Sequence, residues 1–239
     1  MPADIAAAGR LHYEMVRGLL ERGACPANRE LAASLDLSAG ALAETMAALA
    51  ALHGVVLHPH VAEPWIVHPF SLTPTLNFVE APRARDAAAS RGWWAPCVWC
   101  AFGIAVLAGG EVAIHTRWAA ETTPLVLRVK DGEPDSDSAG LPVHFAIPPA
   151  RAWDNVHRHC SLVLPFRSAA DIAPWCARHH QPQGEAVPLR QVALLARLWY
   201  GEHARSDWRK WTVAEAQAIF SAAGLRSAFW NLGEQTGRY

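Results

Sequence analysis

The sequence carries almost no net charge: 21 Lys and Arg side chains against 22 Asp and Glu side chains give 239 residues a formal charge of −1 at pH 7. A chain with this balance has no general attraction for nucleic acid or for an anionic membrane surface. Its apolar stretches are interrupted by glycines or by charged side chains such as Glu44 and Arg197, and none reaches the roughly 18 residues of a membrane span. No basic segment followed by an apolar run opens the chain, so we expect no secretory signal and no membrane partner.

A disulfide framework is also lacking. The five cysteines are an odd number without regular spacing, and we therefore expect reduced thiols and a cytoplasmic protein. The sequence has no phosphate-binding loop, no dinucleotide-binding glycine pattern and no nucleophile-elbow serine. It is 51% hydrophobic and 18% charged, which argues against disorder and favours a large buried core.

The segment 1–68 predicts a winged-helix-like lobe of three helices. Helical spacing of apolar residues, with Asn and Ser as candidate caps of the second and third helices, predicts helices over 4–22, 28–35 and 38–52. Two short strands, 55–57 and 65–67, follow. A DNA-binding role is disfavoured because the third helix carries no Lys or Arg, while phosphate and base recognition need basic or amide side chains.

Three histidines lie in the wing of this lobe. His58, His60 and His68 could bind zinc or copper, since imidazole suits both metals. No cysteine accompanies them and three prolines mark an irregular loop. We interpret them as solvated loop histidines.

The remainder, 69–239, predicts a mixed β-sheet core with flanking helices and a C-terminal helical extension, so the expected fold class is α+β. A surface connector is expected at 80–91. The patterns predict strands at 112–115, 125–129, 143–147 and 160–166, and helices at 100–108, 168–180, 189–200 and 212–224.

Between these elements, three tryptophans and two cysteines fall within the eight positions from Trp93 to Cys100. Tryptophan has a large apolar body whose N–H needs a partner, and a buried cysteine is a small hydrophobe unless its surroundings favour the thiolate. The segment therefore predicts thiols in an aromatic pocket, with Trp94 and Trp99 in its wall. Such a pocket suits a soft-metal or redox site better than a hydrolytic one.

The motif Trp99-Cys100-Ala101-Phe102 resembles the Trp-Cys-Ala-Leu segment of the organomercurial (alkylmercury) lyases. In that family the motif runs on to a catalytic Asp, and a second catalytic Cys lies about sixty positions downstream at the start of a strand. Cys160 fits that place. The resemblance extends from the N-terminal helices to about residue 180. It fails at one position, because Gly103 stands where the family's Asp is expected.

The resemblance implies that Cys100 and Cys160 are the catalytic thiols and the metal ligands. Two soft thiolates would bind mercury and push electron density onto the carbon, and the Hg(II) product would stay bound without a resident cofactor. The implied substrate is a small organometallic or organic molecule, and the protein would be a monomer or a homodimer without a nucleic-acid partner.

Cys97 and Gly103 are the accessory positions of this hypothesis. Cys97 and Cys100 form a lone C-x-x-C pair, which does not by itself predict zinc, and Pro96 is compatible with a helix start that would lower a thiol pKa. Without the Asp, the proton would come from one of these thiols or from a side chain just before Cys160, namely Asp154, His157 or His159. If 157–164 is one strand, both histidines face away from Cys160.

The sequence leaves open whether the protein is an enzyme. The glycine at position 103 also fits a non-catalytic soft-metal-binding protein on the same fold, or a diverged enzyme that binds an organic substrate in the aromatic pocket. Of the other cysteines, Cys176 is expected to be structural and Cys25 incidental.

Overall fold

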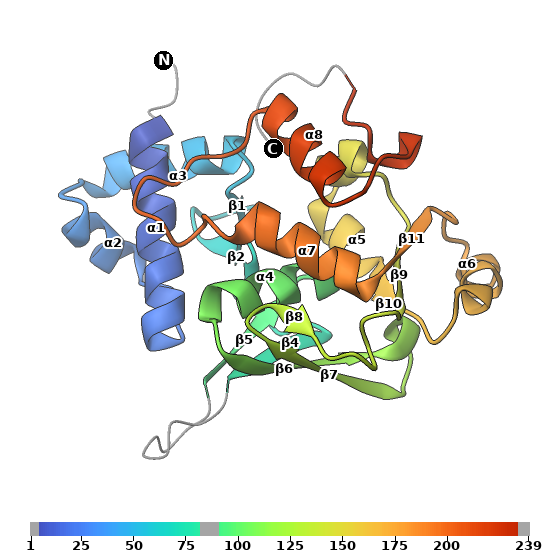
Figure 1. Ribbon diagram of the computed structural model, residues 1–239. Helices are drawn as coiled ribbons and strands as arrows, with labels where there is room; N and C mark the ends of the chain where they lie inside the picture. Colours follow the sequence, from blue (N-terminus) through green and yellow to red (C-terminus); the bar gives the residue numbers. More distant parts are fainter. Residues whose placement is uncertain (1–4, 82–90, 234–239) are drawn as a thin grey trace.

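The computed structural model describes residues 5–81 and 91–233. Three helices form the N-terminal part, coloured blue in Figure 1: α1 (Ile5–Arg22), α2 (Asn28–Ser34) and α3 (Ala39–Ala51). The predicted cap Ser38 accepts the backbone N–H of Ala41. Asn28, the other predicted cap, is instead the first residue of its helix, and the helix is capped at Ala27, whose N–H donates to Glu30.

The structure has an eight-stranded sheet, whose strands β4 to β7 lie along the bottom of Figure 1. Its order is β1-β2-β3-β5-β4-β6-β7-β8. The strands are β1 (Val55–Leu57), β2 (Pro64–Val67), β3 (Phe70–Ser71), β4 (Asn77–Ala81), β5 (Arg91–Ala95), β6 (Glu111–Arg117), β7 (Pro124–Lys130) and β8 (Glu133–Pro134). A smaller sheet has the order β10-β9-β11, formed by β9 (Pro142–Phe145), β10 (Val163–Pro165) and β11 (Glu185–Pro188).

The α+β class is confirmed, but the expected mixed sheet is wrong. All strand pairs within the described ranges are antiparallel. Consecutive strands such as β1 and β2 or β6 and β7 are joined by short connections, which suit antiparallel neighbours, whereas β3 pairs with β5 and β4 with β6, each skipping one strand. The sheet also continues across residue 68, because Val67 of β2 pairs with Phe70 of β3. The division into a lobe over 1–68 and a core over 69–239 stays a prediction.

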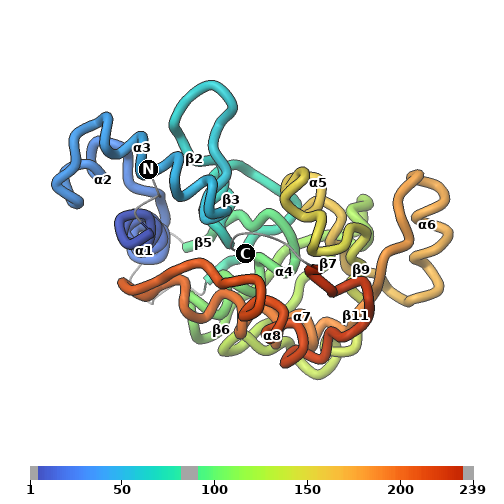
Figure 2. Tube along the Cα trace, turned by 90° about the horizontal axis from the view of Figure 1, so that it is seen from above, coloured from blue at the N-terminus to red at the C-terminus, as the bar shows by residue number. Residues whose placement is uncertain are grey.

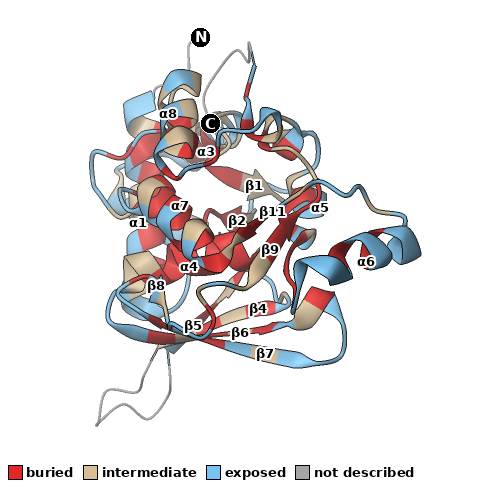
Figure 3. Cartoon of the chain, turned by 45° about the vertical axis from the view of Figure 1, so that its right-hand side comes forward, coloured by how far each residue is buried: buried red, intermediate tan, exposed pale blue. Residues whose placement is uncertain are grey.

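The core is built around helix α4 (Val98–Ala108), which follows β5 directly. Its first eight residues are all buried, because the segment has no polar face to turn toward water. Figure 3 colours most of it as buried, between the sheet and helix α7 (Leu189–Tyr200). It packs against α7 on one side and against β4 and β5 on the other. Whatever projects from the start of α4 therefore lies inside the core.

The predicted strand over 160–166 is wrong at its start. Cys160 lies in helix α5 (Val156–Ser161), and β10 begins only at Val163. Asn155 caps this helix by accepting the backbone N–H of Arg158 at 3.0 Å. The alternation of Cys160, Leu162 and Leu164 suggests a strand, but the Asn cap determines the local structure. The two histidines before Cys160 are therefore helical and do not alternate along a strand.

The C-terminal half contains α6 (Ile172–His179), α7 and α8 (Val213–Ala222), close to the predicted ranges. Thr212 and Glu215 form a capping box at the start of α8. Short 3₁₀ helices lie at Trp118–Ala120, Pro149–Asp154, Ala169–Asp171 and Ala228–Trp230. The predicted connector at 80–91 lies mostly outside the described residues. Within the described part of the chain, no helix combines the length and apolar character needed to cross a membrane.

The segment after α7 returns to the N-terminal helices, as Figure 2 shows from above. The ring of Trp208 stacks on that of His12 in α1, with centroids 3.6 Å apart. A Cβ on Gly9 would come within 2.4 Å of the Trp208 carbonyl oxygen, so the close approach of the two segments requires glycine there. The segment after α7 is thereby packed against α1.

Candidate functional site

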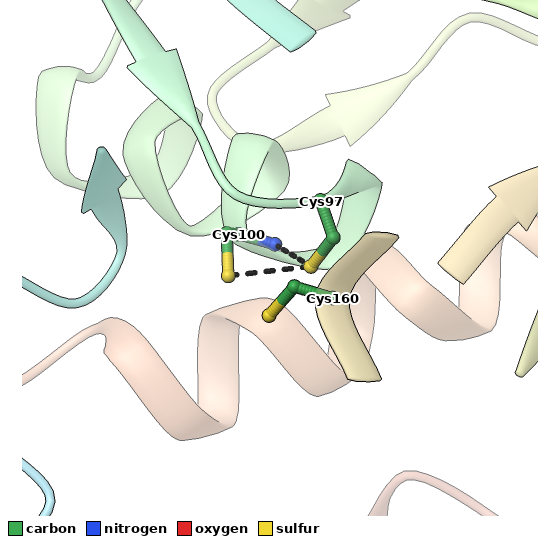
Figure 4. Close-up of side chains that lie close together, drawn as sticks. All are labelled: Cys97, Cys100 and Cys160. Carbon is green, nitrogen blue, oxygen red and sulfur yellow. Dashed lines mark hydrogen bonds between the residues drawn. The ribbon is translucent and has the colours of Figure 1, made fainter. Parts of the chain in front are cut away.

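Three buried thiols converge at the start of α4. The Sγ atoms of Cys97, Cys100 and Cys160 all lie within 4.8 Å of one another. Cys97 is the N-cap residue of α4, Cys100 lies in its first turn, and Cys160 projects from α5. Figure 4 shows the three sulfur atoms pointing toward a common point. The structure thus brings together the two cysteines singled out by the resemblance and adds the accessory Cys97.

The hydrogen bonds of the cluster point toward Cys100. The Cys97 thiol donates to Cys100 Sγ at 3.3 Å, and Cys97 Sγ accepts the backbone N–H of Cys100 at the same distance. Burial opposes ionisation of Cys100, but hydrogen bonds from Cys160, Cys97 and His68 outweigh it and hold its pKa well below the ordinary value.

The other two thiols stay protonated. Burial, followed by the hydrogen bond to Cys100, raises the pKa of Cys97 well above its ordinary value. Hydrogen bonds to Cys100 and Cys97, together with burial, raise the pKa of Cys160 in the same way. Of the three sulfur atoms, Cys100 is therefore the one whose surroundings favour the thiolate, and Cys97 and Cys160 are the ones whose surroundings favour the thiol.

Tyr200, the last residue of α7, also touches the thiolate. Its hydroxyl oxygen lies 3.4 Å from Cys100 Sγ, and burial followed by the charges of the neighbouring thiols raises its pKa well above the ordinary value. The phenol is therefore a hydrogen-bond donor. Its ring fills the space beside Gly103, where an added Cβ would lie 2.3 Å from Tyr200 Cδ2. A tyrosine ring thus occupies the position where the resemblance expects a carboxylate.

Two cavities meet at Cys160. The smaller, of about 40 Å³, is lined by Cys100, Cys160 and Tyr200 together with His68, His159 and Lys210. Burial lowers the pKa of His159 to about 4 and that of Lys210 to about 7. The larger, of about 470 Å³, is lined by Cys160 as well as by Pro96, Thr75, Asn77, His157 and Leu164. Cys160 is thus the thiol that a molecule in the larger cavity meets first.

The expected pocket tryptophans have different places. Trp99 lines the small cavity, and its ring lies 5.4 Å from that of Trp199 and 5.7 Å from that of Tyr200. Trp94 packs on Phe78 across the sheet, with centroids 4.7 Å apart, and lines neither cavity.

The remaining candidate residues are spread over the molecule. His68 is not a solvated loop histidine, because it is buried beside the thiols, whereas His60 is exposed. Across the described ranges, Cys97, Cys100 and Cys160 form the one group of at least three histidine, cysteine or acidic side chains close enough to share a metal ion, so the three wing histidines do not form one. Asp154 forms an exposed ion pair with Arg151.

Sequence reasoning did not identify Tyr200, His68 or Lys210 as part of the site. Each comes from an element distant in sequence from the cysteine motif, and none belongs to a motif of its own. Gly103 was the one available signal, because a glycine within an apolar helix often marks the close approach of another group.

The family model described as alkylmercury lyase, MerB, matches residues 70–201, more than half of the chain. Among solved structures, the fold is similar to the crystal structure of the mercury-bound form of MerB2, with a TM-score of 0.59 and 16% sequence identity. That similarity covers 84% of this chain and 91% of the other. A search of the curated proteins found no match. The chain belongs to the alkylmercury lyase family.

Proposed function

We propose that the protein cleaves the carbon–mercury bond of small organomercury compounds with the thiolate of Cys100 and the thiol of Cys160. The observation that carries the proposal is the meeting of these two sulfur atoms in a chain of the alkylmercury lyase family, and the lowered pKa of Cys100 supports it. Mercury is a soft cation that prefers thiolate sulfur to nitrogen or oxygen ligands. The reaction needs no resident cofactor.

In the first step the Cys100 thiolate attacks the mercury of R–Hg–X. A sulfur–mercury bond forms, the Hg–X bond breaks, and X leaves with the bonding electron pair as a free thiolate or halide. The low pKa of Cys100 supports this role, because no base has to remove a proton before the attack.

We assign the organic group R to the larger cavity. The space beside Cys100 is about 40 Å³, whereas the cavity on the other side of Cys160 is about 470 Å³ and has far more room for a phenyl group. Because Cys160 lines both, a substrate bound to Cys100 would extend past Cys160, with the carbon–mercury bond beside its thiol.

Cys160 then supplies the proton. Its S–H bond breaks, the proton takes the electron pair of the carbon–mercury bond to give R–H, and the sulfur forms the second bond to mercury. Atoms and charges balance without a carboxylate, so Gly103 does not forbid the reaction. The raised pKa of Cys160 supports the assignment, because the thiol keeps its proton until mercury binds. Tyr200 donates to Cys100 from the place where the carboxylate is expected.

A second function, stoichiometric capture of mercury without bond cleavage, is favoured by Gly103. A positioned acid or base typically contributes about 10²–10⁴-fold to a rate, and its loss could leave only the binding step. Both functions use the same two thiols, so only product analysis separates them.

The test is hydrocarbon release. Reduced protein is incubated with phenylmercury and excess small thiol, and benzene is quantified over time. We expect more than one benzene per protein, and none from the double variant Cys100→Ser, Cys160→Ser. Tight mercury binding without benzene would support the capture function instead. If the wild type bound mercury no more tightly than the double variant, both the cleavage and the capture function would be overturned. That result would point to a diverged enzyme that acts on an organic substrate.

A further inference from the structure

We propose that Cys97 is a third sulfur ligand and that the site holds Hg(II) as a three-coordinate thiolate complex. The inference deepens the proposed function, which it needs only as the source of the Hg(II). The binding mode itself can be tested with inorganic Hg(II), independently of bond cleavage.

The geometry of the cluster suits a trigonal site. Three sulfur atoms about 2.3 Å from a central ion, the length of a typical zinc–thiolate bond, lie about 4 Å apart in a plane. The sulfur atoms of Cys97, Cys100 and Cys160 already lie within 4.8 Å of one another, and two of them are 3.3 Å apart. An ion entering the cluster therefore meets three sulfurs at once, and only small side-chain movements are needed to place them around it.

The position of Cys97 is fixed by the backbone. As the N-cap of α4 it has extended backbone angles, and its Sγ accepts the N–H of Cys100. This contact turns the sulfur toward the other two thiols. Capping alone does not require sulfur, because a serine hydroxyl at an N-cap accepts the same bond and is among the preferred residues there. What sulfur adds at this position is affinity for a soft metal.

The charge of a three-sulfur complex also suits this place. Binding one Hg(II) forms three mercury–sulfur bonds and releases to solvent the protons that remain on the thiols, which leaves a complex with one negative charge. The complex would lie at the N-terminus of α4, where the helix dipole favours negative charge. Lys210 lines the same small cavity and offers a buried amine that can carry the balancing positive charge. A two-sulfur Hg(II) complex is neutral, so neither the helix dipole nor the Lys210 amine would stabilise its charge.

The test counts sulfur ligands. Reduced whole chain is loaded with one equivalent of Hg(II) in buffer free of small thiols, and mercury X-ray absorption gives the number and length of the mercury–sulfur bonds. We expect three sulfurs in the wild type, and two with shorter bonds in Cys97→Ser. Retention of Hg(II) against a competing dithiol should fall at least tenfold in the same variant.

Two controls separate ligation from folding. Cys97→Ser keeps an N-cap acceptor and should unfold near the wild-type temperature without metal, whereas Cys97→Ala removes cap and ligand together. Cys176→Ser, which alters a buried thiol elsewhere, should leave three sulfurs. If Cys97→Ser does not fold, the number of mercury–sulfur bonds in the wild type tests the three-sulfur site by itself.

The outcomes are distinct from those of the proposed function. Two sulfurs in the wild type, or identical spectra for the wild type and Cys97→Ser, would overturn the third ligand even if benzene is released. Three sulfurs without benzene release would leave the site standing while the cleavage proposal fails.

Discussion

Cys100 and Cys176 are both buried cysteines near a histidine, yet their surroundings differ. Cys176 Sγ lies 3.9 Å from His144 Nε2, but that nitrogen donates to the Gln183 carbonyl at 2.7 Å. The Cys176 thiol itself donates to the Pro182 carbonyl, and burial raises its pKa. Cys100 Sγ instead accepts the thiol of Cys97 at 3.3 Å and lies 3.4 Å from the Tyr200 hydroxyl, and Cys160, Cys97 and His68 together lower its pKa. The comparison teaches that the donors around the sulfur, rather than burial alone, determine whether the pKa of a buried thiol is lowered or raised.

The largest effect is expected from replacing Cys100, and it tests the contrast with Cys176 directly. Cys100→Ser should slow single-turnover benzene release from phenylmercury by more than about 10³-fold, because a hydroxyl neither ionises at neutral pH nor binds mercury well. Cys176→Ser should leave the rate unchanged. Comparable losses in both variants would mean that the chemistry is not confined to the thiol cluster.

Tyr200→Phe comes next, because it removes one donor from Cys100 and keeps the ring that packs on Gly103. A hydrogen bond to a charged group contributes about 1.5–3 kcal/mol, so cleavage should slow by about 10- to 100-fold. The number of mercury ions bound per protein should not change. The matched control is Tyr13→Phe on α1, which should behave as the wild type. An unaltered rate in Tyr200→Phe would remove the phenol from the reaction.

A side chain at position 103 should have a smaller effect, on stability. The added Cβ of Gly103→Ala meets the Tyr200 ring at 2.3 Å, and overpacking of this kind typically costs about 1–3 kcal/mol. Urea unfolding measures the cost, and Tyr200→Ala combined with Gly103→Ala should recover part of it through non-additivity. Strictly additive effects would contradict direct packing. The same clash means that Gly103→Asp alone should not restore a family-like carboxylate.

The sequence predicted those elements whose signals are local. Helix α3 begins at its Ser38 cap, and α8 begins at the box of Thr212 and Glu215, because caps act within one turn of backbone. Cys160 was placed on a strand because alternation and a short helix give the same pattern over a few residues, and the cap at Asn155 decides between them.

The site itself was predictable only in part. Cys100 and Cys160 came from a resemblance, and the sequence offered no spacing that would bring α4 and α5 together. The contact of Tyr200 with Gly103 depends on how α7 packs across α4, which is a tertiary property with no signature near either residue. The sequence predicts His68 in the wing loop, whereas the sheet continues from β2 into β3 and the side chain is buried.

The smallest expected effect is that of pH on cleavage. Cys100 is a thiolate above its lowered pKa, and Cys160 keeps its proton below its raised pKa, so both groups hold the required state across neutral pH. The rate should change less than about twofold between pH 6.5 and 8.5, falling on the acid side as Cys100 gains a proton and on the alkaline side as Cys160 loses one. Cys25 provides the contrast: burial raises its pKa to about 11, so its alkylation should rise about tenfold per pH unit over the same range.

A step in the cleavage rate near pH 7 would break this prediction in an informative way. Lys210 lines the same cavity, and its pKa is lowered to about 7 by burial, so such a step would point to the amine rather than to the thiols. Lys210→Met keeps most of the length of the side chain and removes its charge. If the step vanished in that variant, the Lys210 ammonium rather than Cys160 would be the proton source. The contrast between Cys100 and Cys176 would then depend on the cation near Cys100 as well as on the thiols that surround Cys100.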